Sequence, residues 1–246
     1  MRDAGIHVGT SGWTYGDWGG PFYPREVKAA GRLAYYAGQF DTLEINATFY
    51  RLPTQTMLDA WNRTLPVSFH LVVKGPRTVT HRGSLADSIE PLAVFWERVR
   101  QLRTLRVILW QFPPSLRADA AGLDRFLRTL PSQVRHAVEL RHASWWDRAE
   151  QVSDVLAGHQ AAWVSVSYPG LPESVQPTTD FLYVRFHGLG KQLYRYDYSR
   201  LELERWAARL KPHLDGRALY AFFNNTYQAH APLNALVFRE LLQTLD

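Results

Sequence analysis

The chain has 246 residues, of which 46% are hydrophobic and 21% are charged, the composition of an ordinary globular protein. It contains no cysteine, which excludes disulfide bonds and thiolate chemistry. The formal net charge is +5, but the arginines that dominate it are scattered along the chain, so charge alone is weak support for a nucleic-acid partner.

Eight short apolar runs recur along the chain, and each ends in a polar residue. They cover residues 7–10, 42–46, 68–74, 106–111, 136–141, 161–167, 181–187 and 218–224. Continuous apolar runs are typical of parallel strands that are buried on both faces. No apolar leader precedes the first run, and no run reaches about 18 residues, so we expect a cytoplasmic protein with no membrane partner.

Amphipathic patterns, with apolar residues three and four apart, lie between these runs and predict helices. They cover residues 27–39, 54–63, 88–103, 120–130, 147–158, 199–210 and 231–245, with Thr54 as an expected N-cap. Only 13 residues separate Ser167 from Phe181, and three of them are prolines, so we expect a short helix or none there.

The alternation of strand and helix predicts an α/β fold in which residues 1–246 form a single (β/α)8 TIM barrel domain. An open, doubly wound sheet is the alternative. That fold is less consistent with residues 9–12, because this glycine-rich turn lacks the G-x-G-x-x-G spacing of a phosphate-binding turn.

The polar strand ends are where we expect the functional site. Residues two apart on a strand share a face. Three such pairs stand at strand ends: Glu44 with Asn46, Glu139 with Arg141, and Arg185 with His187. Because a buried charge without partners is costly, these ends indicate one shared polar cavity. In a barrel it would lie at the C-terminal ends of the strands, where active sites of this fold are built.

The residue types at these ends suggest catalysis on an anionic substrate. Glu44 and Glu139 are candidate general bases, and His187 is a candidate proton donor. The residues expected to bind substrate are Trp13, Asn46, Tyr50, Lys74, Gln111, Arg141, His142, Trp145, Arg185, Asn224 and Asn225. The cations among them offer the donors that phosphate and carboxylate groups accept. For any one residue, membership of a structural ion-pair network is an equally good interpretation.

Three functions remain open from these residues. The first is an enzyme, a hydrolase, acting on a phosphate-bearing small molecule or nucleotide, or on a nucleic acid phosphodiester. The second is a glycoside hydrolase that uses the paired glutamates. The third is a non-catalytic nucleotide or nucleic-acid binding protein. A divalent metal held by Glu44, Glu139 and a histidine would suit the first, although no H-E-x-x-H motif is present.

Taken together, the motifs resemble the YecE-like family (domain of unknown function 72) over nearly the whole chain. The matching segments are residues 9–13, 44–50 with Pro53, 74–81, 111–114, 139–142 with Trp145, 183–188, and 223–225 with Asn234 and Ala235. The resemblance implies a TIM-barrel fold and no known reaction. The chain departs from it at Ser167, where an aspartate is expected; if that acid is catalytic in relatives, the site of this chain is altered.

Overall fold

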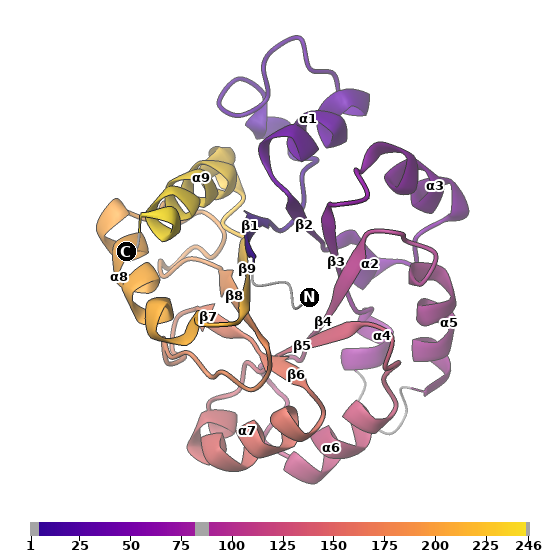
Figure 1. Ribbon diagram of the computed structural model, residues 1–246, viewed down its shortest axis with the longest axis vertical. Helices are drawn as coiled ribbons and strands as arrows, with labels where there is room; N and C mark the ends of the chain where they lie inside the picture. Colours follow the sequence, from indigo (N-terminus) through magenta and orange to yellow (C-terminus); the bar gives the residue numbers. More distant parts are fainter. Residues whose placement is uncertain (1–4, 82–88, 245–246) are drawn as a thin grey trace.

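The computed structural model describes residues 5–81 and 89–244 (Figure 1). Within them, parallel strands form two sheets. One sheet has the order β1 (Ile6–Thr10), β9 (Ala218–Phe223), β8 (Phe181–Phe186) and β7 (Ser165–Ser167). The other has the order β2 (Thr42–Ile45), β3 (His70–Lys74), β4 (Leu105–Gln111), β5 (Arg135–Glu139) and β6 (Ala161–Trp163). All eight predicted strands are present, the sixth as the pair β6 and β7.

The two sheets meet at two places. Strands β6 and β7 are separated by Val164 alone, whose N–H donates to the Val138 carbonyl at 2.9 Å. On the other side, Ser11 forms a single parallel bridge with Glu44 of β2. The strands surround the centre of the molecule and the helices lie outside them (Figure 1). The expected α/β fold with parallel strands is confirmed and is TIM-barrel-like, but the ladder runs as two sheets, because it breaks at Val164 and beside β1.

A tyrosine hydroxyl occupies the gap between β1 and β2. Tyr36 Oη accepts the N–H of Thr10 at 2.8 Å and donates to the carbonyl of Thr42 at 3.1 Å. It therefore replaces direct backbone pairing between the two strands. Gly9 is required here, since a Cβ at this position would lie 2.4 Å from the Thr42 carbonyl oxygen.

The predicted helices are also present. They are α1 (Arg32–Gln39), α3 (Gln55–Thr64), α5 (Ile89–Val99), α6 (Ala120–Arg128), α7 (Ala149–Gly158), α8 (Arg200–Leu210) and α9 (His230–Gln243). The predicted termini Ser88 and Leu245 lie outside the described residues. Thr54 is the N-cap of α3, because its hydroxyl accepts the N–H of Met57 at 3.3 Å. Residues 168–180 contain no helix, as their prolines predict.

Short helical segments follow several strands or adjoin a longer helix. The sequence did not indicate most of them, because one turn is too short to show a periodicity, but Ala29–Gly31 lies within the predicted helix 27–39. These segments are α2 (Ala47–Tyr50), α4 (Arg77–Thr80) and the 3-10 turns η1 (Gly16–Trp18), η2 (Ala29–Gly31), η4 (Ala143–Arg148), η5 (Lys211–His213) and η6 (Tyr227–Ala229). None of the described helices is long and apolar enough to cross a membrane.

The two faces of each strand build separate apolar clusters. On β8, Phe186 packs against the helix residues Trp206 and Phe238. The opposite face carries Phe181 and Tyr183, which belong to a second cluster whose buried members all come from the strand segments. Arg185 is the next residue on that face, so the strand period alone directs its guanidinium into the space enclosed by the strands.

We expect Gly9→Ala to destabilise the protein by about 1–3 kcal/mol, because the added methyl group forces β1 away from Thr42. Denaturant unfolding measures this change. Gly38→Ala in α1 is the matched control: no atom lies within 4 Å of its Cβ position, so a gain of up to about 1 kcal/mol is expected. Equal effects of the two substitutions would show that the β1–β2 contact is not tight.

Candidate functional site

A single arginine joins two buried glutamates at the C-terminal ends of the strands. Arg185 Nη2 donates to Glu44 Oε1 at 2.6 Å, and Arg185 Nη1 donates to Glu139 Oε2 at 2.5 Å. All three side chains are fully buried. Because Arg185 stands on β8, Glu44 on β2 and Glu139 on β5, one guanidinium connects both sheets.

The remaining oxygens of the two carboxylates are also occupied. Glu44 accepts from Ser11 Oγ and from Tyr183 Oη, each at 2.6 Å. Glu139 Oε1 accepts from Arg141 Nε at 2.6 Å. Burial alone would raise the pKa of Glu139, but the charges of Arg141 and Arg185 hold that pKa well below its usual range. Glu139 is therefore ionised at neutral pH, and its role in this geometry is that of a counter-ion.

His187 is neutral in this environment. It is fully buried, and burial lowers its pKa to about 4. Its Nε2 lies 3.2 Å from Glu139 Oε1, and its Nδ1 lies 3.1 Å from Asn224 Nδ2. These partners fit a tautomer with the proton on Nε2, donated to Glu139, and with Nδ1 accepting from the amide. Both ring nitrogens are thus engaged, which does not favour the predicted proton-donor role.

A pocket of about 430 Å³ opens at the strand ends next to this cluster. It is lined by Tyr15, Asn46, Phe49, Tyr50, Lys74, His81, Gln111, Pro114, Arg141, Tyr194, Asn224 and Thr226. Its polar walls consist of two cations, an imidazole, amides and hydroxyl groups. No carboxylate among the described residues lines it, because Glu44 and Glu139 are buried against arginines. The pocket therefore suits an anionic group.

Lys74 is the buried cation of this pocket. Its Nζ donates to Gln111 Oε1 at 2.8 Å and lies 4.0 Å from the ring centroid of Phe49. Within the described residues it has no carboxylate at ion-pair distance. Burial, together with the charges of Arg185 and Arg141, lowers the pKa of Lys74 to about 7, and the charges of Glu139 and Glu44 only partly oppose this shift.

Arg141 presents the second cation. Its Nε is held by Glu139, and its guanidinium carbon lies 5.1 Å from the ring centroid of Tyr168. Its Nη1 has no hydrogen-bond partner in the part of the chain that the structure describes. With one side of the guanidinium fixed, the other remains able to donate to a ligand.

The structure divides the residues that the sequence selected into three groups. Six line the pocket: Asn46, Tyr50, Lys74, Gln111, Arg141 and Asn224. Four form the buried cluster beside it: Glu44, Glu139, Arg185 and His187. Four lie elsewhere: Trp13, His142, Trp145 and Asn225.

The last group has structural contacts instead. Trp13 packs edge-on against Trp61, and Trp145 is fully buried, with its indole N–H on the Leu116 carbonyl. His142 caps the turn that follows β5 through the N–H of Ser144. These side chains follow strand ends in sequence, but the short turn after each strand directs them away from the pocket. Asn225 is buried too, and its amide donates to Tyr196 O and to Asn234 Oδ1.

Several pocket residues were not among the predicted site residues. They are Tyr15, Phe49, His81, Pro114, Tyr194 and Thr226. Most stand in loops or in single helical turns. The sequence has no periodic pattern there from which the direction of a side chain can be predicted. Tyr194 has a positive φ of 73°, an unusual conformation that only coordinates reveal. Tyr183 and Ser11, which complete the shell of Glu44, lie within the quoted motifs, and the two-residue spacing of Tyr183 from Arg185 was a usable signal.

Ser167 is buried at the end of β7, outside the pocket lining. Its hydroxyl accepts from Tyr198 Oη at 2.9 Å and lies 3.5 Å from Glu173 Oε1. Among the described residues, no group of three or more His, Cys, Asp or Glu side chains has the arrangement of a metal site. The described residues therefore offer no set of ligands for the divalent metal that the sequence suggested.

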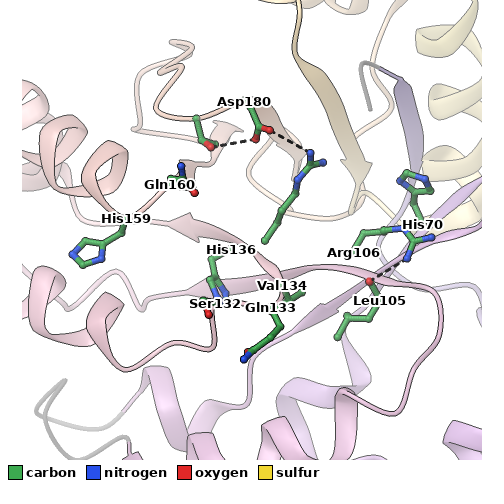
Figure 2. Close-up of a pocket in the computed structure, with 12 residues that line it drawn as sticks. His70, Leu105, Arg106, Ser132, Gln133, Val134, His136, His159, Gln160 and Asp180 are labelled. Atoms are coloured by element: carbon green, nitrogen blue, oxygen red, sulfur yellow. Dashed lines mark hydrogen bonds and ion pairs between the residues drawn. The ribbon is translucent and has the colours of Figure 1, made fainter. Parts of the chain in front are cut away.

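A second pocket, of about 800 Å³, lies at the opposite ends of the strands (Figure 2). Its charged and aromatic groups have partners within the protein. Arg135 lies 3.4 Å from Asp180, Arg106 donates to the Val67 carbonyl, and His136 contacts the Pro131 carbonyl. In barrel-like folds this end contributes stability and the other end carries the chemistry. We therefore place the candidate site at the pocket that contains Lys74 and Arg141.

Comparisons with known proteins agree with the geometry of the fold. A family model described as "Protein of unknown function DUF72" matches residues 7–246. UPF0759 protein YunF of Bacillus subtilis (strain 168) is 25% identical, covering 98% of this chain and 95% of its own. UPF0759 protein YecE of Escherichia coli (strain K12) is 26% identical, covering 63% of this chain and 56% of its own.

Solved structures include a member of the same family and a more distant protein with a similar fold. A DUF72 family protein from Thermotoga maritima MSB8 is 32% identical, with a TM-score of 0.84, and the match covers 97% of this chain and 99% of that one. The catalytic domain of a chitinase from Pyrococcus furiosus is 10% identical, with a TM-score of 0.56, over 99% of this chain and 96% of that one. The second similarity shows a shared fold alone.

Removal of Arg185 tests the ion cluster. We expect Arg185→Ala to lower the free energy of unfolding by about 3–5 kcal/mol, because it leaves two buried carboxylates without their shared counter-ion. Arg209→Ala is the control, since its pair with Glu173 is partly exposed and contributes about 0–1 kcal/mol. Urea unfolding at pH 7 measures both. A loss below about 1 kcal/mol for Arg185→Ala would mean that the cluster is not structural.

Burial of Lys74 should cost stability at neutral pH. Its pKa falls from 10.5 to about 7 on folding, so the unfolded chain binds more protons between these values and stability rises with pH across this window. Lys74→Met removes this cost, and we expect about 1 kcal/mol more stability at pH 7, or about 2–4 °C in Tm. The advantage over wild type should shrink towards pH 10. Lys191→Met, at an exposed lysine, should show no such trend.

Proposed function

The chain belongs to the DUF72 family, as its resemblance to YecE-like proteins predicted, and we propose that it is an enzyme that binds a phosphate-bearing substrate in the pocket at the strand ends. The observation that carries this proposal is the charge of the pocket wall. Lys74 and Arg141 face the pocket, while the two nearby carboxylates are buried and paired with arginines. An anion entering the pocket meets donors and meets no carboxylate from the described residues.

Arg141 is the proposed phosphate-binding group, because one edge of its guanidinium is fixed on Glu139 and its Nη1 can donate to the ligand. Lys74 adds a second positive charge while it is protonated. The amides of Asn46, Gln111 and Asn224 line the same pocket and can hydrogen-bond the polar parts of a substrate. The exposed ring of Tyr50 stands at the rim, where a base or a sugar could stack.

In this proposal, Glu44 and Glu139 position the arginines and do not activate water. Each carboxylate is fully buried and already accepts hydrogen bonds on both oxygens. A hydrolytic reaction stays a prediction, with no base assigned in the pocket. The proposal also takes the two sheets as one barrel domain spanning residues 1–246, with β6 and β7 as a single interrupted strand.

A glycoside hydrolase is the less favoured alternative. Such enzymes place two carboxyl groups on either side of the scissile bond. Here Arg185 lies between the two glutamates and pairs with both, so neither is available to a sugar. The structural similarity to a chitinase domain concerns the fold and adds no support for that chemistry. A non-catalytic nucleotide-binding protein would use the same pocket and differ only in the lack of turnover.

Thermal stabilisation by phosphate compounds tests the proposal. Inorganic phosphate and a nucleoside monophosphate should each raise the Tm of the wild type, by an amount equivalent to about 1.4 kcal/mol at tenfold Kd. Arg141→Gln should abolish the shift. Arg106→Gln is the matched control, because Arg106 lines the pocket at the opposite end (Figure 2) and should leave the shift intact.

The pH dependence of anion binding in this pocket has a defined sign. Loss of the Lys74 proton above about pH 7 removes one positive charge, so sulfate, whose own charge is constant in this range, should bind more weakly at pH 8.5 than at pH 6. A labelled single-stranded oligonucleotide, titrated in increasing salt, separates a polymeric from a small substrate. Equal stabilisation of wild type and Arg141→Gln by every phosphate compound would rule out this pocket as the anion site.

A further inference from the structure

Lys74 differs from Arg141 and Arg185 in having no carboxylate partner among the described residues. Arg141 and Arg185 are each paired with a glutamate at 2.6 Å or less. Within the described residues, the contacts of Lys74 Nζ are the Gln111 oxygen at 2.8 Å and the Phe49 ring at 4.0 Å. The residue is only 8% exposed, yet its side chain reaches the pocket. A buried ammonium without a counter-ion is costly, and the group can avoid the cost by losing its proton.

The surroundings favour the neutral amine. Burial and the nearby guanidinium groups of Arg185 and Arg141 lower the pKa of Lys74 to about 7, while the glutamates act in the opposite direction. A substantial fraction of Lys74 is therefore an amine with a free electron pair at neutral pH, whereas an exposed lysine with a pKa of about 10.4 is almost wholly protonated. A lysine that is desolvated and placed beside other cations is the arrangement that activates an amine as a nucleophile.

Gln111 fixes the orientation of this amine. Its Nε2 donates to the Phe112 carbonyl at 2.8 Å, which determines that its Oε1 faces Lys74. Because Oε1 accepts one N–H of Lys74, the Nζ position is held at the pocket wall and the electron pair can be directed into the pocket. Arg141, whose Nη1 has no hydrogen-bond partner among the described residues, lines the same pocket. A nucleophile and an anion-binding group thus lie on the walls of one small cavity.

We propose that Lys74 is a nucleophilic catalytic residue that forms an imine with an aldehyde or ketone substrate, whose anionic group is bound by Arg141. This inference rests on the proposed phosphate-binding function and narrows its substrate class to carbonyl compounds that carry a phosphate. It also changes the chemistry expected of the site, from activation of water to activation of a carbonyl group.

The covalent step is balanced without any further reactant. The Nζ electron pair of neutral Lys74 forms a bond to the carbonyl carbon, and the carbonyl π electrons move to oxygen. One proton passes from nitrogen to that oxygen and gives a carbinolamine. The nitrogen pair then forms the C=N bond while the C–O bond breaks, and the oxygen leaves as water with a second proton from nitrogen. Protonation of the imine makes it an electron acceptor for bond cleavage at the neighbouring carbon.

The chain is well suited to a labelling test, since it contains only four lysines and the other three are exposed. Pyridoxal 5′-phosphate carries both an aldehyde and a phosphate. The intact protein is treated briefly with a limiting amount of it, reduced with borohydride, and mapped by peptide mass spectrometry. We expect Lys74 to be labelled about 100-fold faster than Lys28, Lys191 or Lys211 at pH 7, because far more of it is unprotonated.

Two further readouts separate a reactive site from a merely accessible one. Labelling of Lys74 should reach half its maximum rate at about pH 7, and inorganic phosphate should protect it. Arg141→Gln should slow the labelling of Lys74 by about tenfold or more, as expected for the loss of a charged hydrogen bond, and leave the other lysines unchanged. Lys191→Arg is the control variant, in which the Lys74 adduct should form as in the wild type.

The outcomes distinguish this inference from the function on which it rests. If phosphate stabilises the protein through Arg141 but Lys74 is labelled no faster than the exposed lysines, the imine proposal is wrong and the phosphate site stands. If Lys74 forms a reducible adduct with glycolaldehyde, which has no phosphate, while phosphate neither binds nor protects, the nucleophile stands and the phosphate site is wrong. Labelling of Lys74 that rises only above pH 9 would overturn the imine proposal.

Discussion

The structure depends on the buried arrangement of one arginine between two glutamates. Arg185 on β8 binds Glu44 on β2 and Glu139 on β5, so its guanidinium connects strands that belong to different sheets. Across the described residues, backbone pairing between the sheets is limited to the Val164 N–H on the Val138 carbonyl and the short pairing of Ser11 and Gly12 with Glu44. The ion cluster and the Tyr36 hydroxyl between β1 and β2 therefore join the two sheets where the ladder does not.

The same cluster determines the character of the pocket beside it. By pairing with both glutamates, Arg185 withdraws negative charge from the pocket wall, and Glu139 in turn fixes one edge of Arg141. What remains exposed to a ligand is the free side of Arg141, a set of amides and Lys74. The positive charge of Arg185 also acts on Lys74 through the low-dielectric interior and favours its neutral form. Stability and reactivity at the strand ends thus arise from one electrostatic arrangement.

The polar groups at the two ends of the strands differ in how they are paired. At the end in Figure 2, Arg135 and Asp180 pair with each other, and His136 contacts a backbone carbonyl. At the other end, and within the described residues, Lys74 is buried without a carboxylate partner and Arg141 Nη1 has no hydrogen-bond partner. A buried polar group that is left incompletely paired costs stability, so the presence of Lys74 at this pocket indicates where a ligand is expected.

The sequence by itself determined the alternation of strands and helices, because buried parallel strands and amphipathic helices leave distinct apolar periods. All eight runs became strands, and the two-residue spacing placed Tyr183 and Arg185 on one inward face. It also located the polar strand ends, since buried charges need partners and charged residues at the ends of several buried runs therefore indicate a shared polar region. The proline-rich segment without a helix and the Thr54 cap followed from local backbone chemistry.

Only the tertiary structure decided which of those polar groups face a ligand. Glu44 and Glu139 could have been bases or counter-ions, and the choice depends on the position of Arg185, which is more than forty residues from either glutamate in sequence. The turns after the strands turned Trp145 and His142 away and brought Phe49, His81 and Tyr194 to the pocket. A single helical turn is too short to show an apolar period in the sequence. The protonation of Lys74 depends on its burial and on charges from distant strands. The sequence therefore specified which residues stand at the strand ends, and packing in three dimensions specified their partners and their charge.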